Sequence, residues 1–403
     1  MGCCGGRSAP PLNQVCHCPA TPLFSVLAVS SIFRLSIVDA LVPDTSSVIP
    51  RWPHMSDPSI DLSCPLPLRH ETIQMAHGGG GRIMRELLEH VMLPAFGNAA
   101  LDARHDAAVL TMGGARVAFT TDTFVVHPRF FPGGDIGELA VYGTVNDLAM
   151  GGAVPQFLSC AFILEEGFSL DELRRIVASM RAAADRCGVA IVTGDTKVVD
   201  KGHGDGLFIN TAGIGLVAEG VDVAPRRVVP GDAVIVSGDL GRHGVAVMSV
   251  RDGLAFESPV QSDCGPVHHL AAALINGGVD VHCLRDPTRG GLASVLNEIA
   301  ADAKVAIEAV ERDIPVDEGV AAACEILGLD PFYVACEGRM VAFVPAAQAA
   351  QALALLRALP EGHGAAIIGQ VKEGPAGAVM LRTRMGTQRL LDLLSGEQLP
   401  RIC

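Results

Sequence analysis

The chain has 403 residues, enough for two domains of ordinary size. Its 30 Lys and Arg against 44 Asp and Glu give a formal charge of −14, which disfavours binding to nucleic acid or to anionic membrane surfaces. Apolar residues make up 49%, but no charge-free run reaches the roughly 18 residues of a membrane span. The 12 cysteines include no CxxC pair, which favours a reduced cytoplasm over a disulfide framework.

The first 54 residues differ from the rest in being rich in Cys, Pro and Ser. An apolar stretch at 23–42 is interrupted by Arg34 and Asp39 and lacks a convincing basic region and cleavage site, so it does not predict a signal peptide. Met55 is a plausible alternative start. We expect 1–54 to be a disordered or untranslated leader and 55–74 to be an N-terminal arm.

A first folded domain is predicted over residues 75–222. Strand-like runs alternate with helical segments, at 116–120, 157–164, 189–192 and 207–210. The helix between the second and third runs is framed by a Ser169 and Glu172 capping box and by Gly188 at its end. Its predicted apolar stripe is Leu173, Ile176, Val177, Met180 and Ala184. This pattern indicates a sheet covered by helices.

A second domain is predicted over residues 226–384, after the charged joint at 225–227. An apolar strand at 232–238 runs into a Gly-rich loop at 238–244, and further strands are expected at 340–344 and near Ile367 and Met380. A helix is expected between them at 346–359. Residues 385–403 are expected to be a mobile tail ending at Cys403. A tail of roughly 15 residues can extend about 50 Å, enough to enter a cleft and leave it again.

Two Gly-rich segments could approach a polyphosphate. Residues 77–82 contain four consecutive glycines before a helix expected near Ile83, so bare amides and a helix start could favour an anion. In the second domain, residues 286–291 again place an aspartate before glycines at a helix start. No Walker motif is present, so a flexible linker is the alternative for the first segment. The predicted phosphate-binding glycines are Gly78, Gly79, Gly80 and Gly81.

Several aspartates are expected at points where strands or helices turn into loops. Carboxylates gathered at one edge of a sheet repel one another unless cations lie between them. Hard oxygen ligands without a Cys/His pattern suit Mg²⁺, and the implied ligand is Mg-ATP. The predicted metal ligands are Asp106, Asp122, Asp147, Asp195 and Asp286.

These motifs resemble those of the HypE family of hydrogenase maturation factors, part of the aminoimidazole-ribotide-synthetase-like (PurM-like) superfamily. The resemblance covers residues from about 75 to 403. It rests on the segments 77–82, 120–123, 130–134, 146–147, 194–199, 286–291 and the terminal Pro400-Arg401-Ile402-Cys403. The cysteine terminus distinguishes this family from its superfamily relatives.

The resemblance implies an α/β (α+β) fold of two domains, an N-terminal ATP-binding one and a C-terminal one, with a flexible tail. It implies a homodimer built through the first-domain sheets. A carbamoyltransferase partner, HypF, would place a carboxamide on Cys403, and ATP would drive its dehydration to a thiocyanate. The cyanide group would then pass to iron on a HypC–HypD complex during assembly of the nickel-iron hydrogenase centre. No nucleic-acid or membrane partner is expected.

Other residues are assigned to this chemistry as candidates. Lys197 could stabilise charge at the transferred phosphoryl group, and Glu337 beside Gly338 could be the base. We expect Thr121, Asn146 and Asn210 to contribute to ATP binding. The alternative is that Glu337 is a solvated loop charge and that Lys197 merely pairs with Asp195. Two further histidines, His203 and His243, lie beside glycines in expected loops and are given no role.

Two rival functions remain open. The first is another enzyme of the same superfamily, such as a selenophosphate synthetase, a thiamine-phosphate kinase or a purine-pathway cyclase, which would leave Cys403 unexplained. The second is a non-catalytic metal or thiol carrier that uses the aspartates and Cys403. Such a carrier would bind metal whether or not nucleotide is present.

Overall fold

The computed structural model of the chain describes residues 70–253, 260–394 and 402. All of them belong to one compact unit spanning Leu66–Cys403. The predicted leader at 1–54 and the first part of the predicted arm lie outside the described residues, as does Cys403.

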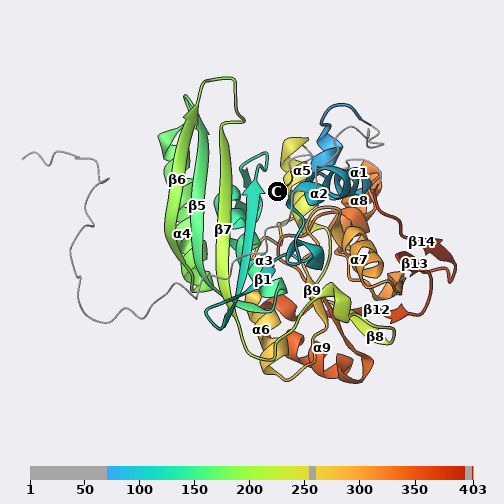
Figure 1. Cartoon of the computed structure of the whole chain (residues 1–403). Coiled ribbons are helices and arrows are strands. Elements are labelled where there is room, and N and C mark those ends of the chain that lie inside the picture. Colours follow the sequence, from blue (N-terminus) through green and yellow to red (C-terminus); the bar gives the residue numbers. More distant parts are fainter. Residues whose placement is uncertain (1–69, 254–259, 395–401, 403) are drawn as a thin grey trace, which may run out of the picture. The chain divides into compact units, whose positions relative to one another are not determined.

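The first half of this unit is built on a five-stranded sheet in the order β1-β2-β7-β5-β6, of which β6, β5 and β7, in green, stand side by side in Figure 1. All neighbours pair antiparallel except β5 and β6. The strands are β1 (Ala108–Met112), β2 (Ala115–Phe124), β5 (Ala153–Glu165), β6 (Ala190–Val199) and β7 (Leu207–Val217). They include the predicted runs, except that β6 begins one residue after the predicted start at Val189. A two-stranded ribbon joins β3 (Phe130–Phe131) to β4 (Gly134–Asp135).

Two helices, α3 (Ile136–Met150) and α4 (Leu170–Cys187), pack together and α3 covers one face of this sheet. The Ser169 hydroxyl caps α4 by accepting from the Glu172 N–H, and Gly188 ends it at φ +67°, as predicted. Ile176 and Met180 are buried, but Val177, placed in the same stripe by the sequence, is 45% exposed. The side chains of Ile176, Met180 and Ala184 face the core, so the side chain of Val177 lies at the edge of the buried face of the helix.

The other face of the five-stranded sheet carries exposed apolar side chains. Phe119 pairs with Ile214, which in turn pairs with Phe157, so the three side chains form a row across β2, β7 and β5. Each is between 44% and 49% exposed. Leu216 and Val154 form a second exposed pair beside this row. A contiguous apolar surface of this kind is typical of a protein–protein contact.

The second half contains a seven-stranded sheet in the order β14-β13-β10-β12-β8-β11-β9. Successive residues of β8 (Asp232–Val236) alternate between two cores. Val234 packs in one cluster with Leu292 of α7 (Gly291–Asp302), and Ile235 packs in another with Leu270 of α6 (His268–Asn276). Because both faces are covered, β8 reads as a continuous apolar run. The remaining strands are β9 (Cys283–Arg285), β10 (Ala306–Val310), β11 (Val341–Pro345), β12 (Ala366–Lys372), β13 (Ala378–Arg382) and β14 (Gln388–Leu390).

Helices and short turns connect these strands. The second-half helices are α5 (Arg242–Arg251), α6 (His268–Asn276), α7 (Gly291–Asp302), α8 (Glu318–Leu327) and α9 (Ala349–Arg357). Ahead of the first sheet come η2 (Met75–Gly78), α1 (Arg82–Leu87), η3 (Leu88–Met92), α2 (Leu93–Phe96) and η4 (Leu101–Ala103). Single turns lie at η5 (Pro225–Arg227), η6 (Glu311–Asp313), η7 (Pro331–Tyr333), η8 (Ala346–Gln348) and η9 (Pro360–Gly362). The expected loop at 238–244 is shorter than predicted, since α5 begins at Arg242.

The segment predicted as a mobile tail from residue 385 begins instead as part of the fold. Strand β14 pairs with β13, with Arg389 opposite Leu381. The Leu391 side chain is fully buried, and its carbonyl accepts from the Asn297 side-chain amide at 2.8 Å. Pairing with β13 and burial of Leu391 therefore order residues 388–391. The polar sequence around these residues predicts neither the pairing nor the burial.

No helix among residues 70–253 and 260–394 is long and apolar enough to cross a membrane. The cysteines of the same part of the chain are free thiols: Cys160, Cys187, Cys264, Cys283, Cys324 and Cys336.

Candidate active site

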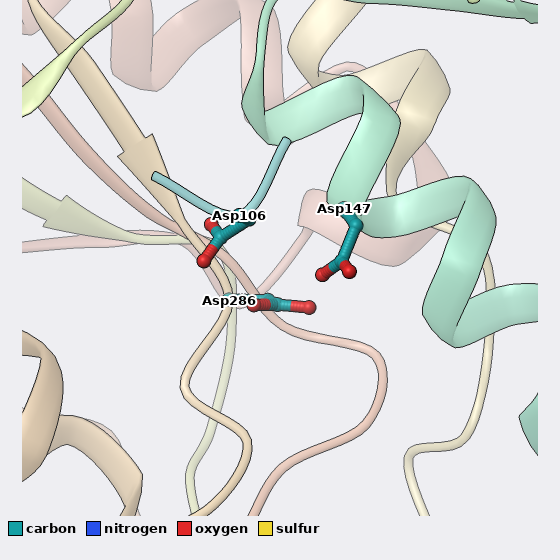
Figure 2. A group of neighbouring side chains, drawn as sticks. All are labelled: Asp106, Asp147 and Asp286. Atoms are coloured by element: carbon teal, nitrogen blue, oxygen red, sulfur yellow. The ribbon is translucent and has the colours of Figure 1, made fainter. Parts of the chain in front are cut away.

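Three aspartates from distant parts of the chain meet in one place. Asp106 precedes β1, Asp147 lies on α3, and Asp286 follows β9. Figure 2 shows the three side chains grouped together, with the carboxyl groups of Asp147 and Asp286 next to each other, and one oxygen of each of the three residues lies within 4.8 Å of the others. They line a cleft of about 240 Å³ together with Asp122 and Glu337. The structure thus brings together four of the five predicted metal ligands.

A threonine hydroxyl joins two of these aspartates. Thr120 on β2 lies 2.8 Å from the main-chain oxygen of Asp106 and 2.9 Å from Oδ2 of Asp147. Thr120 points to the same face of its strand as Asp122, because side chains two residues apart on a strand share a face. The sheet and α3 therefore position the cluster from opposite sides.

Burial and mutual repulsion shape the charge of the cluster. Burial, followed by the charges of neighbouring carboxyls, raises the pKa of Asp147 well above its usual range. Burial likewise raises the pKa of Asp106 well above its usual range and that of Asp286 to about 6. Carboxyls that resist ionisation when close together become favourable ligands once a cation balances their charge.

Arg285, which the sequence analysis did not identify, forms an ion pair with Asp106, one of the three clustered aspartates. Arg285 Nε lies 2.7 Å from Oδ1 of Asp106, and its Nη2 lies 2.7 Å from Oε2 of Glu298. The other Asp106 oxygen, Oδ2, is buried without a hydrogen-bond partner among the described residues. Arg285 immediately precedes the Asp286 motif, but its partner Asp106 is in the other half of the chain, so local spacing could not reveal the pair.

Glu337 is buried in the same cleft rather than solvated on a loop. Only 4% of the residue is exposed, and its Oε1 has no hydrogen-bond partner among the described residues. Burial, together with the charges of Asp286, Asp122 and Asp263, raises its pKa well above the usual range. The alternative of a solvated loop charge is therefore wrong.

The Gly-rich segment contacts the second half directly. The Gly80 carbonyl accepts from the Ser294 hydroxyl at 3.0 Å, and Gly80 lines the cleft. At φ +74°, a Cβ on Gly80 would lie 2.7 Å from Cβ of Arg289. By contrast, Gly78 is exposed and has open space around it. Gly81 precedes α1 as its N-cap, and Gly79 closes η2.

Of the other predicted nucleotide contacts, Thr121 lines the cleft. Asn210 Nδ2 donates to the Asp122 carbonyl at 2.8 Å and lies 3.1 Å from Oγ1 of Thr121, so it braces that strand. Asn146 is buried and uses its amide elsewhere. Its Nδ2 donates to the Gly265 carbonyl and its Oδ1 accepts from the Val267 N–H. Both contacts tie α3 to the second half of the unit.

Asp195 and Lys197 lie apart from the aspartate cluster. Both are on the exposed edge strand β6, with side chains 63% and 69% exposed. They pair with each other, with Lys197 Nζ 2.5 Å from Asp195 Oδ2. The recurrence of Asp at strand–loop transitions suggested one shared edge, but β7 and β5 separate β6 from β2. Cys403, the predicted carrier of the substrate, lies outside the described residues.

Comparison with known families agrees with this architecture. Residues 104–217 match the AIR synthase related protein N-terminal domain, and residues 229–382 match the corresponding C-terminal domain. The carbamoyl dehydratase HypE of Azotobacter vinelandii is 51% identical over 338 residues, which are 84% of this chain and 99% of that protein.

Two solved structures are similar over nearly their whole length. A HypE in complex with ATP has a TM-score of 0.70 at 47% identity, and the match covers 82% of this chain and 100% of that one. A HypE–HypF complex contains a chain with a TM-score of 0.73 at 47% identity, covering 76% of this chain and 99% of that one.

The two-sheet fold and the acidic cleft between its halves define a two-domain α/β protein of the AIR synthase related class. Within that class, the chain belongs to the HypE family of carbamoyl dehydratases.

Proposed function

We propose that this protein uses ATP to dehydrate a carboxamide carried on its own Cys403 to a thiocyanate, the source of the cyanide ligand for the iron of nickel-iron hydrogenase. The observation that carries the proposal is the meeting, in one cleft, of a three-aspartate cluster and the buried carboxyl of Glu337, whose Oε1 has no hydrogen-bond partner among the described residues. The first suits a metal-bound polyphosphate, and the second suits proton removal.

The donor set of the cleft fits Mg²⁺. Asp106, Asp147 and Asp286 supply hard oxygens, and the buried Oδ2 of Asp106 lacks a protein partner among the described residues. When bound, Mg²⁺ would neutralise charge on the phosphates of ATP. The cleft of about 240 Å³ is smaller than a typical drug-sized pocket, so it fits the polyphosphate end of the nucleotide. Asp122 would support this end from β2, with Gly80 opposite it.

The carboxamide oxygen is a poor leaving group, which explains the need for ATP. Transfer of the γ-phosphoryl group to this oxygen allows the C–O bond to break with phosphate as the leaving group. Two N–H protons are lost as the C≡N bond forms, one to a base of the protein and the other to the departing phosphate. Glu337 is the proposed acceptor of a proton, because a carboxyl whose pKa is raised by burial is a stronger base once ionised.

A homodimer is part of the proposal. The exposed row of Phe119, Ile214 and Phe157 gives the five-stranded sheet a face suited to a second copy. Asp195 and Lys197 lie on the edge of the same sheet, outside their own chain's cleft. We assign Lys197 to charge stabilisation, and Asp195 to the metal, at the cleft of a second copy approached by β6.

The partners follow from the family. HypF is the proposed source of the carbamoyl group, which is supported by the solved complex of a related HypE with HypF. A HypC–HypD complex is the proposed acceptor of cyanide, and the cytoplasm is the proposed compartment. The rival free-substrate enzymes and the carrier are disfavoured by membership of the carbamoyl dehydratase family.

The Gly80→Ala substitution should raise the KM for Mg-ATP about tenfold. The added Cβ would overlap Cβ of Arg289 and strain a positive-φ residue, so the Gly-rich segment must move away from the 286–291 loop. Gly78→Ala is the matched control, because no atom lies within 4 Å of its new Cβ. Initial rates at varied ATP would measure both, and equal KM values in the two variants would remove Gly80 from the phosphate site.

Mass spectrometry of the C-terminal peptide tests the proposed function. After incubation with the carbamoyltransferase, carbamoyl phosphate and ATP, followed by removal of the nucleotide, the carbamoyl adduct on Cys403 should lose one water only when Mg-ATP is added again. Cys403→Ser is the control and should show no thiocyanate. ATP consumption with an unmodified Cys403 would instead favour an enzyme of the same superfamily that acts on a free small molecule.

A further inference from the structure

The last described residue of the chain is held by a buried histidine. His243, the second residue of α5, is fully buried, and its Nε2 lies 2.6 Å from the carbonyl oxygen of Ile402. Its ring also packs edge-to-face on Phe131 at 5.2 Å between centroids. The sequence placed His243 in a loop without a role, but the structure places it inside a helix start, facing the end of the chain.

The hydrogen bonds around His243 fix its tautomer. A carbonyl can only accept, so Nε2 carries the proton and donates to Ile402. Burial lowers the pKa of His243, which keeps the ring neutral and leaves Nδ1 as an acceptor. The Ser262 hydroxyl, 2.9 Å away, therefore donates to Nδ1 and itself accepts from the Cys264 N–H at 2.9 Å. The three hydrogen bonds therefore run in one direction, from the Cys264 N–H through Ser262 and His243 to the Ile402 carbonyl.

The Ile402 side chain is also held. It is 5% exposed and packs in a cluster that draws residues from both halves, including Phe131 of β3, Val247 of α5 and Ala335. One apolar contact and one hydrogen bond therefore fix both the side chain and the main chain of this residue. An exposed chain end without a docking site would bury neither.

The segments that hold Ile402 also hold the proposed base. The Gly244 N–H, next to His243, donates to the Ala335 carbonyl at 3.1 Å, two residues before Glu337. The Gly265 N–H, from the loop that carries Ser262, lies 3.4 Å from the Glu337 carbonyl. These two hydrogen bonds join the main chain beside His243 and the loop that carries Ser262 to the segment that carries Glu337.

We propose that His243 is a positioning residue that docks the C-terminal tail by donating a hydrogen bond to the Ile402 carbonyl. This inference rests on the proposed function, because the residue that follows Ile402 is the Cys403 on which the carboxamide is carried. The carbonyl carbon of Ile402 is bonded to the Cys403 nitrogen, so the hydrogen bond acts one peptide unit from the reacting residue. His243 does not line the cleft to which we assign ATP.

Two isosteric variants separate this role from simple packing. In His243→Asn the amide oxygen can take the place of Nδ1 and accept from the Ser262 hydroxyl, while no donor remains at the position of Nε2, so the bond to Ile402 is lost. In His243→Gln the amide nitrogen takes the place of Nε2 and can still donate to Ile402. Both variants lose the ring and its contact with Phe131, so a purely structural role predicts equal effects. His203→Asn, an exposed residue between β6 and β7, is the surface control.

The measurement is the rate at which iodoacetamide alkylates Cys403 in the full-length protein, followed by mass spectrometry of the C-terminal peptide. His243→Asn should react about five- to tenfold faster than wild type, the factor expected for one lost hydrogen bond. His243→Gln and His203→Asn should react near the wild-type rate. In single turnovers, His243→Asn should also slow water loss from carbamoylated Cys403 while leaving the KM for ATP unchanged.

Equal alkylation rates in His243→Asn and His243→Gln would overturn the proposal. If both variants fail to fold, Ile402→Ala replaces them, since it lies at the chain end and removes the apolar contact. Alkylation of Ile402→Ala at the wild-type rate would also overturn it. The alkylation assay needs neither ATP nor a partner, so a failure of the dehydratase proposal, seen as carbamoylated wild-type Cys403 that never loses water, is distinguishable from a failure of the docking proposal.

Discussion

Replacing Asp147 by asparagine should abolish the ATP-dependent loss of water from Cys403 while leaving the fold intact. The substitution removes one of three converging carboxyl groups that we assign to the metal-bound polyphosphate. Transfer of a phosphoryl group depends on charge neutralisation and positioning, and removal of one such contact costs about 10² to 10³ in rate. Single-turnover mass spectrometry would measure the loss, and titration calorimetry with Mg-ATP would measure the accompanying loss of binding.

The fold should tolerate this change. Asparagine has nearly the shape of aspartate and can still accept from the Thr120 hydroxyl, which lies 2.9 Å from Oδ2 of Asp147. It also removes a carboxyl group that is disfavoured by burial and by Asp286 and Asp106, so thermal stability should be unchanged or higher. Asp171→Asn, in the exposed first turn of α4, is the control for a surface charge. A folded Asp147→Asn protein with wild-type activity would refute the metal assignment.

The Glu337→Gln substitution should leave ATP binding in place but halt dehydration, so that carbamoylated Cys403 accumulates. Glutamine is close to the same size and cannot accept a proton as a carboxylate does. General-base catalysis is commonly worth 10² to 10⁴ in rate, and a decrease of about that size is expected. The ratio of carbamoyl to thiocyanate forms of the C-terminal peptide would report the block directly.

The pH dependence of stability provides a second readout for Glu337. Its pKa in the folded protein is raised well above the usual 4.5, mainly by burial. In the unfolded chain the group ionises near its usual pKa, so the folded state loses stability as pH rises above about 4.5 and up through the raised pKa. Glutamine does not ionise, so the Glu337→Gln variant does not lose this stability. Its melting temperature should therefore exceed that of wild type by a margin that grows with pH.

One outcome would contradict the role of Glu337 as the base, and another would contradict the raised pKa of its carboxyl group. Rapid dehydration in the glutamine variant would exclude it as the base. A margin in melting temperature that stays constant with pH would mean that Glu337 is ionised in the folded protein, and hence that its burial does not hold the proton.

The sequence was sufficient to predict where helix α4 begins and ends and where several strands lie. Ser169 and Gly188 mark the ends of α4 because capping and a left-handed C-cap depend on neighbouring residues alone. The alternating and continuous apolar runs predicted β2, β5, β7 and β8 for the same reason, since their side chains must match a sheet period. The cleft-lining aspartates were also predicted, from their places where strands or helices turn into loops, and Glu337 was predicted from its place beside Gly338.

Only the tertiary structure decided which of these residues meet. It joined Asp106 with Asp286 and Arg285 across the two halves of the chain, and it placed Asp195 and Lys197 on an outer strand, because strand order is set by long-range pairing. Residues 388–391 were ordered by a partner strand and a buried leucine rather than by local pattern. His243 gained its contact with Ile402 in the same way. A hydrogen bond between residues so far apart in the chain depends on packing, which no local spacing encodes.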